Sequence, residues 1–71
     1  ISITKKDTQN FVGYFFKSGR LGGFKFYGYK NYGKRFLTEK KADEMAALWN
    51  KRNTLYEFKK EWVEDSVLMY V

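Results

Sequence analysis

The sequence predicts an α+β fold. We expect an antiparallel β-meander, with strands near residues 10–17, 23–30 and 35–37, that carries one α-helix on one face and is followed by one or two C-terminal strands. Three observations predict it: aromatic-rich segments separated by glycines in the first half, apolar residues at helical spacing after residue 40, and renewed alternation near the C-terminus. The length of 71 residues fits a single small domain covering residues 1–71.

The N-terminal half supplies the strands of the meander. Residues 1–4 alternate apolar and polar side chains, which predicts a short first strand. Residues 10–17 carry four aromatic side chains and predict the next strand. Residues 18–23 contain three glycines and predict the turn of a hairpin, with 23–30 as the partner strand. A turn at 31–33 then leads to a third short strand at 35–37.

A helix is expected at about residues 39–52. Ala42, Met45, Ala46 and Trp49 recur at the spacing of one helical face. Thr38 is a suitable N-cap, and acidic residues follow it in the first turns, where they favour the positive end of the helix dipole. We expect the apolar face to pack on the predicted sheet.

The C-terminal segment allows two interpretations. As a strand, residues 54–63 place Tyr56, Phe58 and Trp62 on one face; as a helix, Leu55, Phe58 and Trp62 form a stripe. The aromatic content and the alternation favour the strand. Residues 66–71 are apolar and predict a terminal strand at a sheet edge.

The positive charge is concentrated in the first half of the chain. Residues 1–36 contain eight basic residues and one acidic residue, whereas residues 37–71 contain six basic and seven acidic residues. The first half therefore carries a formal charge of +7 and the second half −1. A field of this kind attracts polyanions such as nucleic acid, an anionic membrane surface or an acidic protein patch. The alternative is a solvated charge distribution that has no partner.

Composition excludes several classes of function. The chain contains neither His nor Cys, which removes histidine acid–base chemistry, thiol nucleophiles, disulfides and the usual zinc and iron–sulfur ligands. The acidic residues form no catalytic pair, so we expect no enzyme activity, no cofactor and no metal. No segment approaches the roughly 20 apolar residues that a membrane span requires.

The candidate binding site lies on the predicted strand at 23–30. Phe24 and Phe26 should face the helix, which leaves Lys25, Tyr27 and Tyr29 on the open face of the sheet. Cations alternating with aromatic rings suit DNA or RNA, because rings stack on bases and cations neutralise phosphates. Ordinary cross-strand pairing of the two tyrosines with Tyr14 or Phe16 is the structural alternative. The candidate phosphate contacts are Arg20 at the hairpin tip, Lys25, Lys30, Lys34 and Arg35.

One stretch of the sequence resembles a known group of proteins. Residues 34–50, Lys34-Arg-Phe-Leu-Thr-Glu-Lys-Lys-Ala-Asp-Glu-Met-Ala-Ala-Leu-Trp-Asn50, are followed by Tyr56-Glu-Phe58. This resembles the strand, Phe-x-Thr cap, Ala-rich helix and strand at the end of many small phage and prophage proteins of Gram-positive bacteria. The resemblance covers residues 34–60. It implies a cytoplasmic setting in a bacterium or phage-infected cell, and it implies no particular activity.

The sequence leaves three functional hypotheses. The first is a non-enzymatic nucleic-acid-binding accessory protein. The second is a protein–protein interaction module, which binds a host protein or forms a homodimer, because residues 11–16 are apolar on both faces of their strand. The third is a secreted cationic antimicrobial protein, which fits the charge and aromatic content but not the well-formed helix.

Overall fold

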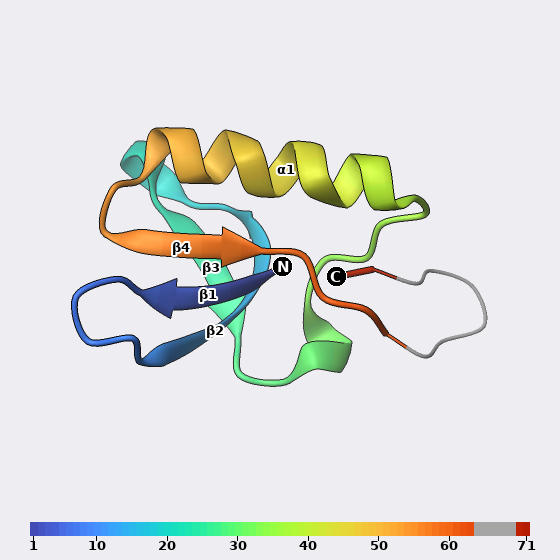
Figure 1. Ribbon diagram of the computed structural model, residues 1–71, viewed down its shortest axis with the longest axis horizontal. Coiled ribbons are helices and arrows are strands. Elements are labelled where there is room, and N and C mark those ends of the chain that lie inside the picture. The colour runs from blue at the N-terminus through green and yellow to red at the C-terminus, as the bar shows by residue number, and fades with distance from the viewer. Residues whose placement is uncertain (64–69) are drawn as a thin grey trace.

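Helix α1 (Glu39–Arg52) lies across one face of a four-stranded antiparallel sheet in the computed structural model of the protein (Figure 1). The structure describes residues 1–63 and 70–71. The strands are β1 (Ser2–Lys5), β2 (Phe11–Ser18), β3 (Phe24–Tyr27) and β4 (Tyr56–Lys59), and their order across the sheet is β3-β2-β1-β4. The predicted α+β class is confirmed, including the helix on one face and a C-terminal strand.

Strand β2 contains two irregularities that change which side chains share a face. Its pairing with β1 shifts between Ile3 and Thr4, and its pairing with β3 shifts between Phe15 and Lys17. At a β-bulge two residues of one strand lie opposite a single residue of its partner, and the normal alternation is lost. At the second shift, Phe16 therefore joins Lys17 on the side of the sheet opposite Phe15.

The core lies between the sheet and α1. It contains Ile1, Ile3, Phe15 and Phe58 from the sheet side, together with Phe36 and the helical Ala42, Ala46 and Trp49. Phe24 of β3 packs its ring against those of Trp49 and Phe58, with centroid distances of 5.9 and 5.4 Å. The predicted apolar stripe of the helix is thus the buried one, although Met45 is only partly buried.

Polar side chains fix α1 against the rest of the protein. The Thr38 hydroxyl accepts a hydrogen bond from the Lys41 amide (3.2 Å), which confirms the predicted N-cap. The Asn50 side chain donates to the carbonyl oxygen of Phe58 (2.8 Å) and accepts from its amide (2.7 Å). Asn50 therefore occupies the outer edge of β4, which is the edge strand on this side of the sheet.

The prediction of a third meander strand at 35–37 is wrong. Among the described residues, Phe36 belongs to no strand and forms an isolated bridge with Tyr70, whose carbonyl accepts from the Phe36 amide (2.8 Å). The place beside β2 is taken by β1, so the meander consists of β1, β2 and β3. The strand expected at 23–30 also ends early, at Tyr27, and residues 30–32 form the short 3₁₀ helix η2 (Lys30–Tyr32).

The ambiguous C-terminal segment is a strand, over a shorter range than 54–63. Strand β4 pairs antiparallel with β1 and ends at Lys59. Of the terminal strand predicted at 66–71, residues 66–69 lie outside the described residues. Tyr70 forms bridges with Phe36 and Trp62, neither of which belongs to the sheet. The described part of this segment therefore does not pair with a sheet edge.

Candidate nucleic-acid interface

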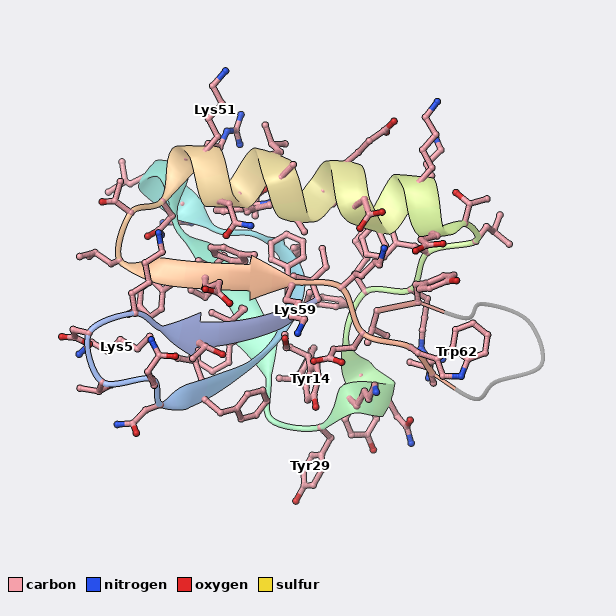
Figure 2. The ribbon with its side chains drawn as sticks, viewed as in Figure 1. Lys5, Tyr14, Tyr29, Lys51, Lys59 and Trp62 are labelled. Atoms are coloured by element: carbon pink, nitrogen blue, oxygen red, sulfur yellow. The ribbon has the colours of Figure 1, made fainter. Side chains whose placement is uncertain are left out.

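The face of the sheet opposite α1 is rich in aromatic side chains. Because Phe24 faces the core, the pleat of β3 directs Lys25 and Tyr27 to the opposite side. Tyr14 of β2 lies across from Tyr27 on this side, and Tyr29 follows in the next loop. In Figure 2, Tyr14 and Tyr29 lie on the side of the sheet away from α1, whereas Lys51 extends from the far side of the helix. We call this side the open face.

Four of the rings on and beside the open face form a continuous strip. The ring centroids are 5.1 Å apart for Phe16 and Tyr27, 5.9 Å for Tyr27 and Tyr32, and 6.1 Å for Tyr29 and Tyr32. The interplanar angles run from 59° to 84°, so no two of these rings stack face to face. We call Phe16, Tyr27, Tyr29 and Tyr32 the aromatic strip. With Gly28 they line an open pocket of about 590 Å³.

Two lysines lie directly opposite each other beside this strip. Lys17 of β2 pairs with Lys25 of β3, and the Lys17 ammonium lies 5.7 Å from the centroid of the Phe16 ring. Like charges at directly opposite positions of a sheet destabilise it. Among residues 1–63 and 70–71, every ion pair in the structure involves Lys40 or Lys60, so no carboxylate neutralises this lysine pair. An anion bound between the two ammonium groups would relieve their repulsion.

Two of the seven predicted site residues, Lys25 and Tyr27, share the open face of β3. Tyr29 lies beyond the end of β3, where its ring meets that of Tyr32. Arg20 is exposed in the 3₁₀ helix η1 (Arg20–Gly22), in the turn that joins β2 and β3. Lys30 is half-buried in η2.

The last two predicted site residues lie beyond η2. The Lys34 amide donates to the Phe15 carbonyl (2.8 Å), and its ammonium lies 5.8 Å from the Phe36 ring centroid. Arg35 donates to the Asn31 carbonyl (3.5 Å) and is engaged further within the protein. These contacts hold Lys34 and Arg35 in the segment that leads to α1, and Lys34 lines a small hollow together with Phe16 and Lys17 of β2.

Sequence reasoning missed three residues of this surface as site residues. Phe16 shares the face of Tyr14 by ordinary alternation, whereas Lys17 joins this face through the bulge in β2, which a period of two residues cannot indicate. Tyr32 lay in a segment predicted to be a turn, and η2 brings its ring to Tyr27. The signal that could have found Tyr32 is the spacing of aromatic residues at 27, 29 and 32 around a glycine.

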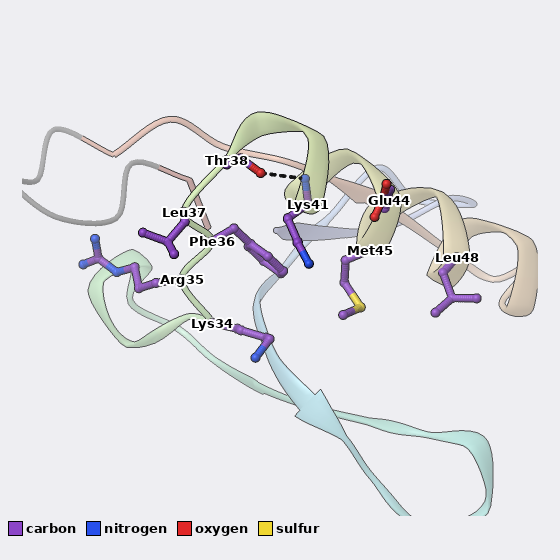
Figure 3. Close-up of a pocket in the computed structure, with 9 residues that line it drawn as sticks. All are labelled: Lys34, Arg35, Phe36, Leu37, Thr38, Lys41, Glu44, Met45 and Leu48. Atoms are coloured by element: carbon purple, nitrogen blue, oxygen red, sulfur yellow. Dashed lines mark hydrogen bonds between the residues drawn. The ribbon is translucent and has the colours of Figure 1, made fainter.

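A second hollow lies beside α1. It has a volume of about 710 Å³ and is lined by Lys34, Arg35, Phe36, Leu37, Thr38, Lys41, Glu44, Met45 and Leu48. Figure 3 shows Phe36, Met45 and Leu48 in a row along the helix, with Lys34 and Lys41 beside the Phe36 ring. Leu37 is 68% exposed and Leu48 43% exposed. We call this hollow the helix groove.

The described residues offer neither a metal site nor a membrane-spanning helix. Residues 1–63 and 70–71 contain no group of three or more His, Cys, Asp or Glu side chains that could hold a metal ion. Within the same ranges no helix is long and apolar enough to cross a membrane.

Comparison with known proteins adds no family. No protein-family model, no curated protein and no solved structure matches this chain. The open face and the helix groove are the two surfaces whose chemistry indicates a function.

Proposed function

We propose that this protein is a small, non-enzymatic nucleic-acid-binding accessory protein that uses the open face of its sheet. The observation that carries the proposal is the uncompensated Lys17–Lys25 pair next to the aromatic strip. Phosphates neutralise the lysines, and the rings offer apolar area to the bases. The cytoplasmic setting implied by the resemblance at residues 34–60 is compatible with either DNA or RNA.

The proposed contacts form a central group and an outer group. Lys17, Lys25, Tyr27 and Tyr29 form the central contacts. Lys30 lies between Tyr29 and Tyr32 in η2, Lys34 lies beside Phe16 and Lys17, and Arg20 lies in the turn of the β2–β3 hairpin. These three cations extend the proposed phosphate path. Arg35 contributes mainly positive charge, because internal contacts engage its guanidinium.

Fluorescence anisotropy with labelled DNA and RNA, titrated at several salt concentrations, tests the proposal. Lys25→Glu should weaken binding to every sequence, and it should reduce the slope of log affinity against log salt by about 0.7 for each lost phosphate contact on a single strand. The matched control is Lys51→Glu, which makes the same charge change on the far side of α1. Equal affinity losses for the two variants, or no saturable binding by the wild-type protein, would reject the proposal.

The helix groove favours a second candidate function, that of a protein–protein interaction module. Exposed Leu37 and Leu48 beside a partly buried Met45 form an apolar surface that a partner could cover. The mass in solution and the proteins retained by the immobilised chain should both be compared between wild type and Leu48→Glu. A dimer or a retained partner that is lost only in Leu48→Glu, and kept in Lys25→Glu, supports this function. A monomer that retains no partner rejects it.

A further inference from the structure

The aromatic strip presents its rings to solvent although it lies on a folded sheet. Tyr29 is 76% exposed and Tyr32 63% exposed, and Tyr27 and Phe16 are exposed as well. Apart from the short 3₁₀ helix η2, which carries Tyr32, no helix or strand of the described residues lies on this side of the sheet (Figure 1). The rings contact one another in edge-on or tilted arrangements, so much of the area of their faces remains available to a flat ligand.

Gly28 leaves room for such a ligand between Tyr27 and Tyr29. A Cβ atom placed on Gly28 would have no atom within 4 Å, so the space above its backbone is open. The pocket around it is lined almost entirely by aromatic rings. Aromatic rings around an open backbone position suit a base plane, which is flat and has two apolar faces.

A nucleic acid can use this surface only where its bases are unpaired. Within a duplex both faces of each base are covered by its neighbours, whereas an unpaired base can leave the stack and lie against a protein ring. Duplex readers instead insert a helix or a two-stranded ribbon into the major groove. Helix α1 has four basic and three acidic residues, so it carries little net positive charge for that role.

We propose that the polymer bound by this protein is single-stranded, with unpaired bases stacked on Tyr27, Tyr29 and Tyr32 and the adjoining phosphates on Lys17 and Lys25. This inference rests on the proposed function and names its ligand class. The aromatic strip is long enough for about two or three bases. Aromatic residues on the β-sheets of other proteins that bind single strands stack the same number. Stacking is tolerant of sequence, so the discrimination should be between unpaired and paired polymer rather than between sequences.

The main rival arrangement uses the β2–β3 hairpin in the groove of a duplex. Its tip carries Arg20 and the fully exposed Leu21, which could contact a phosphate and a base step. The two arrangements need different residues, because Arg20 lies at the hairpin tip and Tyr29 follows the other end of β3. A variant in each residue therefore separates them.

The experiment compares three labelled probes at physiological ionic strength: an oligothymidylate of about 12 nucleotides, an abasic strand of the same length and charge, and a duplex of the same length. We expect the oligothymidylate to bind at least about tenfold more tightly than either of the others, since each stacked base contributes a factor of about five or more. Tyr29→Ala should weaken binding of the oligothymidylate about fivefold or more and leave the abasic strand unchanged. Tyr29→Phe should retain the wild-type affinity.

The outcomes separate this inference from the proposed function. Equal affinity for the oligothymidylate and the abasic strand would overturn base stacking. Tighter binding of the duplex, lost in Arg20→Glu and kept in Tyr29→Ala, would overturn the single-stranded ligand in favour of the hairpin. In both cases a loss of affinity in Lys25→Glu would leave the proposed function standing. Absence of binding to all three probes at low salt would overturn both.

Discussion

Replacing Asn50 with alanine removes two hydrogen bonds that join α1 to the edge of β4. The side-chain amide of Asn50 bonds both the amide and the carbonyl of Phe58, at 2.7 and 2.8 Å. Each partly buried hydrogen bond contributes about 1 kcal/mol, so the loss is about 2 kcal/mol. Alanine is the better helix former by about 0.5 kcal/mol, which offsets part of this loss. The unfolding free energy should therefore fall by about 1.5 kcal/mol.

Urea denaturation of wild type and Asn50→Ala measures this difference, and thermal unfolding should show a Tm lower by about 6–12 °C. The matched control is Lys51→Ala, a neighbouring exposed position on α1 whose side chain points away from the sheet (Figure 2). The control should change the unfolding free energy by less than about 0.5 kcal/mol. If Asn50→Ala changes it no more than Lys51→Ala, the Asn50 amide does not hold the strand and the reasoning is refuted.

Three further predictions concern the rest of the fold. Gly13→Ala should lower the unfolding free energy by about 1–3 kcal/mol, since the new Cβ would lie 2.6 Å from the Phe26 ring and 2.8 Å from the Tyr27 carbonyl oxygen. Gly28→Ala is the control, because a Cβ at Gly28 meets no atom within 4 Å. Similar urea midpoints for the two variants would contradict the close packing of β3 against Gly13. Leu21 has a φ of 55°, in the left-handed region, which asparagine tolerates better than leucine, and the next residue has a φ of 78°. Leu21→Asn should therefore raise the unfolding free energy by about 1 kcal/mol. A urea midpoint that stays the same or falls would argue against strain in this turn. The Lys60 pKa is raised by its hydrogen bonds to Asp43 (2.8 Å) and Glu39 (2.6 Å), so the ion pairs stabilise the fold below pH 10.5, and this stabilisation is lost as the pH rises through the raised pKa. The stability deficit of Lys60→Gln, measured by urea denaturation, should therefore be present at neutral pH and vanish in alkali; a deficit that does not change with pH would count against these ion pairs.

Local chemistry made the helix and the central hairpin predictable. The apolar stripe of α1 follows the 3.6-residue period of an amphipathic helix. The Thr38 cap joins two residues only three positions apart, Thr38 and Lys41. The turn at 18–23 was readable from its glycines, and the alternation of residues 24–27 correctly separated Phe24 from Lys25 and Tyr27. These features involve neighbours in the sequence, so the sequence displays them.

Features that depend on distant partners were not readable. The prediction at 35–37 failed because Phe36 forms an isolated bridge with Tyr70, far along the chain, while β1 occupies the place beside β2. Asn50 looks like any exposed polar residue of a helix until β4 is placed beside it. The open face was predicted through Lys25, Tyr27 and Tyr29, but its second lysine depends on the register between β2 and β3, and the position of the Tyr32 ring depends on η2.

The hydrogen bonds of Asn50 also give the sheet one closed edge and one open edge. The backbone of Phe58 at the outer side of β4 is bonded to α1, whereas no strand among the described residues pairs with the outer side of β3. Unpaired strand edges are where sheets of separate molecules join. A strand that adds at β4 must displace Asn50 from Phe58, whereas one that adds at β3 displaces no strand among the described residues.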